Sequence, residues 1–188
     1  MMKMKDLKRL YKYNHEKKTF IIDVQLEDYR DAYSEWDFSP FNNRDLDDDL
    51  TEYLLECSYE IPAKMPLVIN FHILNQEKND SREKKSISGM YNYFEYEMRK
   101  LKNHRMRMIR DTIAFFMVGS VLLVIGALLD SYLPHTLLTR VLTEGFSIGG
   151  WVMIWEMFSA WFFDIKKISY KIKHFMKLKE STIEYTYP

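Results

Sequence analysis

The sequence IAFFMVGSVLLVIGALL, residues 113–129, decides the fold class, because it contains no charged side chain. A membrane-spanning helix needs about 20 mostly apolar residues, and this stretch reaches that length with its neighbours. A second stretch, FSIGGWVMIWEMFSAWFF at residues 146–163, is apolar apart from Glu156. The alternative for each stretch is a buried helix of a soluble core. Together they predict a membrane α-helical hairpin with two transmembrane helices.

Basic residues flank the two apolar stretches, whereas the connection between them, residues 130–145, carries only Arg140. Basic residues collect on the cytoplasmic side of membrane helices. We therefore expect both chain termini on the cytoplasmic side of a bacterial inner membrane. The basic residues nearest the stretches should contact anionic lipid headgroups. These residues are Arg105, Arg107, Arg110, Lys166 and Lys167.

Glu156 is the one charged residue inside the second stretch. A carboxylate near the centre of a membrane helix costs about 2.5–3.5 kcal/mol, so it normally faces protein, a partner or water. Three interpretations stay open at this point. Glu156 occupies a pore or relay position, or it holds an oligomer by a buried hydrogen bond, or it is a neutral packing residue bonded to Ser159 or to the partner helix.

Small residues recur along both apolar stretches. Small side chains let helix backbones approach closely in lipid. We expect these positions to pack the hairpin on itself and on a second copy, and therefore expect a homo-oligomer. The helix-packing candidates are Gly119, Gly126, Gly145, Gly149 and Gly150.

Residues 1–110 are predicted to form a small cytoplasmic α+β domain. Apolar residues alternate with polar ones at residues 19–26 and 67–74, which predicts two strands. Residues 45–57 place apolar side chains at helical spacing, with acids in the first turn. A helical pattern then continues from about residue 81 into the first apolar stretch, which predicts one long helix.

The remaining segments complete the predicted division of the chain. Residues 111–164 form the transmembrane hairpin, and residues 165–188 form a basic cytoplasmic tail. Apolar residues alternate again at 182–187, so the tail either joins the sheet as a third strand or is frayed.

The sequence contains few residues or motifs that are typical of catalytic or metal-binding sites. The formal net charge is zero, but acidic residues predominate between residues 23 and 60 and basic residues flank the apolar stretches. Cys57 is the only cysteine, which excludes an intrachain disulfide. No phosphate-binding, nucleophile-elbow or zinc-protease motif is present. We therefore predict no catalytic residue, no cofactor, no metal and no nucleic-acid partner, and we expect that the chain is not an enzyme.

An aromatic segment, DAYSEWDFSPFNN at residues 31–43, lies between the predicted first strand and the helix. It either packs under the domain or presents a surface to a partner. Trp36, Phe38 and Phe41 are the candidate partner-binding residues.

Two stretches carry a resemblance to known proteins. The sequences YRDAYSEWDFSPFNNRDLDDDLTEYLLECSYEIP at residues 29–62 and GGWVMIWE at residues 149–156 resemble a family of small, uncharacterised bacterial two-pass membrane proteins. This resemblance assigns no activity to any residue. In layout alone, the chain also resembles the two-span membrane effectors of bacterial antiphage signalling.

The leading functional hypothesis is a membrane-anchored, non-enzymatic cytoplasmic binding or sensor module that is oligomeric. Its partners would be membrane lipids, a second copy, and an operon-encoded protein or a small signalling ligand. The alternative is an oligomeric pore-forming or membrane-disrupting effector, for example of an antiphage defence system. An enzyme that uses the acidic segment is the last-ranked hypothesis.

Overall fold

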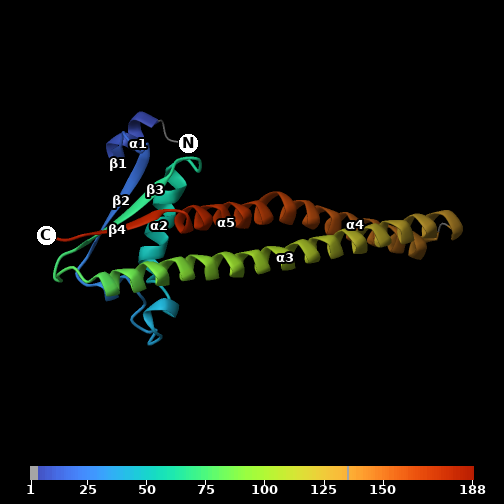
Figure 1. Cartoon of the computed structure of the whole chain (residues 1–188). Helices are drawn as coiled ribbons and strands as arrows, with labels where there is room; N and C mark the ends of the chain where they lie inside the picture. Colours follow the sequence, from blue (N-terminus) through green and yellow to red (C-terminus); the bar gives the residue numbers. More distant parts are fainter. Residues whose placement is uncertain (1–3, 135) are drawn as a thin grey trace. The chain divides into compact units, whose positions relative to one another are not determined.

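The computed structural model describes residues 4–134 and 136–188, except for the side chain of Phe41. Its contacts divide the chain into two compact units. Unit 1 comprises Met1–Lys100 and Lys171–Pro188, and unit 2 comprises Leu101–Tyr170. The helix α3 (Asp80–Tyr132) contributes residues to both units and is unbroken, as the sequence pattern predicted (Figure 1).

Unit 1 is built around a four-stranded sheet with the strand order β1-β2-β3-β4. β2 (Thr19–Leu26) and β3 (Leu67–Ile73) confirm the two predicted strands and pair in parallel, with Ile22 opposite Ile69. β4 (Thr182–Thr186) also joins β3 in parallel, so the C-terminal residues form a strand of the sheet. The sequence analysis did not predict the helix α1 (Met4–Leu10) or the antiparallel edge strand β1 (Lys12–Asn14).

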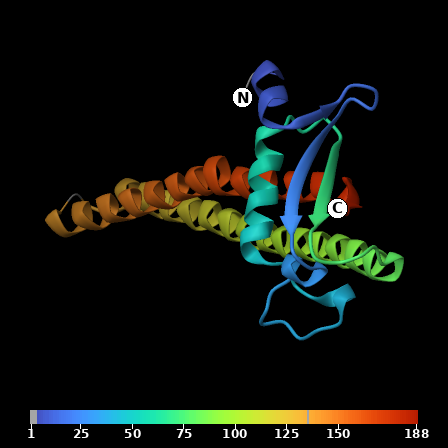
Figure 2. The ribbon, with the colours of Figure 1, turned by 90° about the vertical axis from the view of Figure 1, so that its left-hand side faces the viewer.

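The sheet has one buried and one open face. Side chains alternate between the two faces of a strand, and eight apolar ones of β2 and β3 lie on the buried face, whereas Ile21 and Val68 lie on the other. The eight buried residues are Phe20, Ile22, Val24, Leu26, Leu67, Ile69, Phe71 and Ile73. Polar side chains such as Asp23, Asn70 and His72 lie on the other face and are partly exposed. Figure 2 shows α2 running beside β2 and β3.

The helix α2 (Asp48–Glu60) begins three residues later than the predicted start of 45. The Asp47 side chain accepts hydrogen bonds from the backbone N–H groups of Asp49 and Leu50, so it caps the helix from outside. Asp48 and Asp49 remain in the first turn, where their charge favours the positive end of the helix dipole. Short 3₁₀ helices η1 (Tyr29–Ala32) and η2 (Phe41–Asn43) precede it.

The other end of α2 is held by α5 (Ile165–Lys179), whose final turns belong to unit 1. The buried Lys177 Nζ donates to the carbonyl oxygens of Ile61 at 2.9 Å and of Ser58 at 3.4 Å. A cation at these carbonyls satisfies groups that the end of α2 leaves open. Burial nevertheless lowers the pKa of Lys177 to about 8.

Unit 2 consists of the second part of α3, the helix α4 (Leu137–Ser159), the π-helical turn η3 (Ala160–Asp164) and the start of α5. Its helical segments run antiparallel, because Gly119 of α3 lies beside Gly150 of α4, and Gly126 lies beside Thr143 and Ser147. The side chains of Arg105 on α3 and Ser169 on α5 also meet.

The prediction of two transmembrane helices is wrong. Among the described residues, α3 is the one helix that is long and apolar enough to cross a membrane. The charged residues Arg140, Glu144 and Glu156 interrupt the apolar character of α4. In addition, α4 ends at Ser159, so the last apolar residues of the predicted span belong to η3.

Candidate functional site

The aromatic segment forms a loop, residues 34–45, between two closely joined ends. The backbone N–H of Ser34 donates to the carbonyl oxygen of Asp45 at 2.9 Å, and that of Asp47 donates to Ala32 at 3.1 Å. Such compact surface loops with adjacent ends are frequently functional. The buried Tyr33 anchors the loop, because its hydroxyl donates to the carbonyl oxygen of Ser86 on α3 at 2.9 Å.

Ser86 joins three parts of unit 1. Its side-chain oxygen lies 3.0 Å from the Tyr33 hydroxyl and accepts a hydrogen bond of 2.8 Å from Tyr185 on β4. Burial raises the pKa values of both tyrosines, so both remain neutral at physiological pH. The base of the loop is therefore fixed to the long helix and to the C-terminal strand.

Asp37 determines which side chains the loop tip presents. Its carboxylate accepts hydrogen bonds of 2.8 Å from the backbone N–H groups of Ser39 and Asp45. The Ser39 side chain, followed by these two N–H groups, lowers the pKa of the carboxyl group. With Asp37 directed into the loop, its neighbours Trp36 and Phe38 project outward. They are 96% and 98% exposed. The side chain of the third predicted residue, Phe41, lies outside the described part of the structure.

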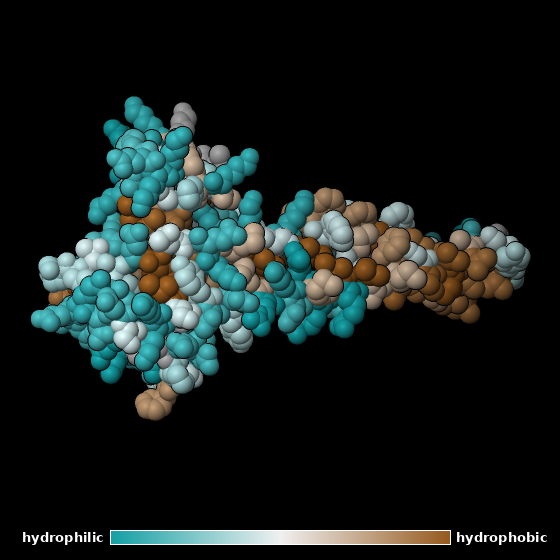
Figure 3. All heavy atoms as spheres, viewed as in Figure 1, coloured by the Kyte–Doolittle hydropathy of each residue, from teal (hydrophilic) through white to brown (hydrophobic). Residues whose placement is uncertain are grey.

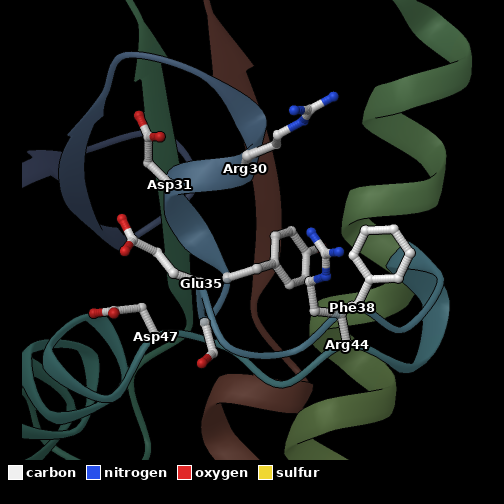
Figure 4. A pocket seen from close by; sticks show the side chains of 8 residues that line it. Arg30, Asp31, Glu35, Phe38, Arg44 and Asp47 are labelled. Carbon is white, nitrogen blue, oxygen red and sulfur yellow. The ribbon is translucent and has the colours of Figure 1, made fainter.

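A pocket of about 680 Å³ lies beside the loop. Figure 4 shows carboxylates on one side of it and Arg30, Arg44 and Phe38 on the other. Two of the carboxylates are already engaged by backbone N–H groups, because Asp31 accepts from Glu27 and Asp28, and Asp47 caps α2. The groups of the site that a partner could contact are therefore the rings of Trp36 and Phe38 and the charged side chains near them. Tryptophan and arginine are enriched among residues that dominate protein–protein binding.

We predict that the base and the tip of the loop contribute differently to stability. Tyr33→Phe removes a buried hydrogen bond and should lower the free energy of unfolding by about 1–2 kcal/mol. Trp36→Ala should change it by less than about 0.5 kcal/mol, because the ring is almost fully exposed. Urea unfolding of the full chain in detergent measures both values. An equal loss for Trp36→Ala would mean that the tip packs against the chain.

Unit 2 carries an apolar surface on α3. Between Ile113 and Leu128, large apolar side chains on several turns are about half exposed or more, and few residues of this stretch are buried inside the protein. Figure 3 shows hydrophobic residues gathered over this part of the chain. Contiguous apolar surface of this kind marks contact with a partner or with lipid.

The five glycine candidates differ in their surroundings. A Cβ atom on Gly150 would lie 2.7 Å from Leu123 Cγ, and one on Gly119 would lie 2.9 Å from the Gly150 carbonyl oxygen. Gly126 also approaches α4 closely, whereas Gly149 has only Leu122 nearby and Gly145 has nothing within 4 Å. Packing of α3 on α4 within one chain therefore accounts for Gly119, Gly126 and Gly150.

The charged candidates of unit 2 lie mainly on its surface. Arg107, Arg110, Lys166 and Lys167 are exposed, and so is Glu156 on α4. Arg105 is partly buried, and its Nη1 donates to Ser169 Oγ at 3.5 Å. This bond places the basic residues of α3 beside the start of α5, where Lys166 and Lys167 lie.

No protein family, curated protein or solved structure matches this chain. The resemblance to bacterial two-pass membrane proteins therefore stays a prediction.

The sequence analysis missed a polar cluster on the open face of the sheet. Asp23 accepts hydrogen bonds from Lys12 at 2.8 Å and Asn70 at 3.0 Å, and it lies 2.7 Å from His72 Nε2. Partial burial favours the neutral carboxyl group, but the bonds from Lys12, His72 and Asn70 prevail and lower its pKa to about 2. Thr186 extends the cluster to β4 by donating to Asn70. Because these groups satisfy one another, we interpret the cluster as fixing the alignment of the four strands.

Proposed function

We propose that this chain is a membrane-anchored, non-enzymatic binding module. In this proposal the apolar segment of α3 is inserted into a lipid bilayer, and unit 1 presents the Trp36–Phe38 loop to a protein partner. The observation that carries the proposal is the outward-facing apolar surface of α3 between Ile113 and Leu128. Exposure of apolar surface to water costs about 25 cal/mol per Å², and a bilayer removes this cost.

The basic residues before the apolar segment of α3 indicate on which side of the membrane unit 1 lies. Arg105, Arg107 and Arg110 precede the apolar segment of α3, and such basic residues favour the cytoplasmic side of a membrane. The part of unit 1 that ends at Lys100 lies on the same side of the apolar segment as these basic residues. We therefore propose that unit 1 lies in the cytoplasm.

The loop supports the binding role. Two aromatic rings that are held outward by a fixed base lose little conformational freedom when they are buried by a partner. A protein partner with an apolar recess would cover Trp36 and Phe38, while charged groups beside them, such as Arg30 and Glu35, would set its orientation.

Membrane flotation followed by alkaline carbonate extraction tests the anchoring. The full chain should float with the lipid and remain in the pellet after the extraction. Protease added to inside-out vesicles should cleave unit 1, whereas protease added to right-side-out vesicles should leave it intact. Release of the chain by carbonate would overturn the proposed insertion, and the opposite pattern of cleavage would overturn the proposed side.

A further inference from the structure

A groove of about 620 Å³ runs along unit 2 where α4 passes through η3 into α5. It combines four aromatic rings with one cationic side chain. The residues that line it are Trp155, Phe158, Ser159, Phe162, Phe163 and Lys166. Lys166 Nζ lies 4.8 Å from the centre of the Phe162 ring, and the rings of Phe158 and Phe162 stack at 6.3 Å.

The π-helical turn lies at the centre of this groove. The backbone N–H of Ile165 donates to the carbonyl oxygen of Ala160, five residues earlier, so the helix is locally widened. Such turns are rare within α-helices and frequently occur at functional sites. Here the turn is continuous with α4 and α5, and the groove residues remain on one side of the combined helix.

Contacts between the antiparallel helices of unit 2 show how the groove lies along α3. Arg105 meets Ser169, and Gly119 meets Gly150. Lys166 is three residues before Ser169 and is therefore level with about residue 108 of α3. Along the axis of α3, residue 108 lies roughly 7 Å before Ile113, where the apolar segment starts. Counted from the same contact, Trp155 lies level with about residue 119, within the apolar segment, and its neighbour Ile154 does approach Gly119.

The groove is therefore polar at one end and apolar along its length. Its cation lies at the boundary of the apolar surface, and its aromatic rings extend from that boundary inward. The acidic residues of this segment, Glu156 and Asp164, do not line it. A molecule with a negatively charged head and a long apolar chain is complementary to this arrangement.

We propose that this groove binds one anionic phospholipid, with its phosphate at Lys166 and an acyl chain along the rings of Trp155, Phe158 and Phe162. The inference rests on the proposed insertion into a bilayer. It goes beyond a general attraction of basic residues to headgroups, because it assigns the lipid to a single site and gives Lys166 a role that the adjacent Lys167 lacks.

Quenching of Trp155 fluorescence tests the assignment. The full chain with Trp36→Phe, Trp151→Phe and Trp161→Phe retains Trp155 as its one tryptophan. It is reconstituted into vesicles that contain brominated phosphatidylglycerol among unbrominated phosphatidylcholine, or brominated phosphatidylcholine among unbrominated phosphatidylglycerol. At equal mole fractions of the brominated lipid, phosphatidylglycerol should occupy the site about fivefold more readily, as one basic side chain at a membrane surface allows.

Lys166→Gln should abolish this preference and leave quenching by phosphatidylcholine unchanged. Lys167→Gln makes the same change of charge one residue further along, outside the groove, and should retain most of the preference. Equal losses in the two variants would overturn the single site, and so would equal quenching by both lipids in the starting protein. Absence of quenching by either lipid would also overturn the site, whereas release of the chain by carbonate would separately overturn the insertion of α3.

Discussion

Replacing Val121 and Val124 together with arginine is expected to release the chain from the membrane. Both side chains belong to the apolar segment of α3, and they are 54% and 58% exposed. An arginine near the centre of a membrane helix costs about 2.5–3.5 kcal/mol, so the pair costs roughly 5–7 kcal/mol. The fraction of the chain that stays in the membrane pellet after carbonate extraction measures the effect.

The same helix offers a matched control. Tyr96 and Met106 are also exposed on α3, at 55% and 60%, but they lie before the apolar segment and near its basic residues. Tyr96→Arg with Met106→Arg adds the same charge and should leave the chain in the membrane. If the Val121 and Val124 variant also remained there, the outer surface of α3 would not contact lipid, and the proposed function would fail.

The strands and the long helix could be predicted because their signals are local. β2 and β3 each carry an apolar residue at every second position, and these residues form the buried face of the sheet, so the period of two is clear despite the additional apolar Ile21 and Val68. The pattern of α3 has no proline between Asp80 and Tyr132, and its helical spacing continues through Gly89. By contrast, β1 is only three residues long and part-exposed, and it carries no such alternation.

The second membrane helix was predicted wrongly because the apolar run was assessed without the boundaries of the helix. The run at residues 146–163 looks continuous in the sequence, but the helix α4 starts at Leu137 and therefore includes Arg140 and Glu144. Its last aromatic residues lie in η3. A change from α-helical to π-helical hydrogen bonding leaves no recognisable signal in side-chain composition.

The site could be predicted only in part, because its side chains form hydrogen bonds with residues that are distant in the sequence. The segment around Trp36 was identified from its aromatic composition, but its outward direction depends on Asp37, Tyr33 and the distant Ser86. In the same way, Asp23 and His72 look unrelated in the sequence and become neighbours only when β2 and β3 pair. Contacts of this kind follow from the register of strands and helices, which a single sequence does not specify.

The packing of α3 on α4 should depend strongly on the size of the side chain at residue 150. Gly150→Leu should lower the free energy of unfolding by about 3 kcal/mol, which is the upper part of the usual range for overpacking. Even the first atom of the new side chain would lie 2.7 Å from Leu123 Cγ and 2.9 Å from the Gly119 carbonyl oxygen. Because the second of these is a backbone atom, the two helices must separate to make room.

Gly145→Leu provides the matched control for this substitution. Gly145 lies on the same helix, and a Cβ atom there would meet nothing within 4 Å. The same side chain should therefore be neutral or slightly stabilising, since leucine favours a helix more than glycine does by roughly 0.5–1 kcal/mol. Unfolding by sodium dodecyl sulfate in detergent micelles, followed by tryptophan fluorescence, compares the two variants. Equal free energies of unfolding for the two variants would contradict this prediction. They would show that α3 and α4 accommodate a large side chain at the close approach of Gly119 and Gly150 without losing stability.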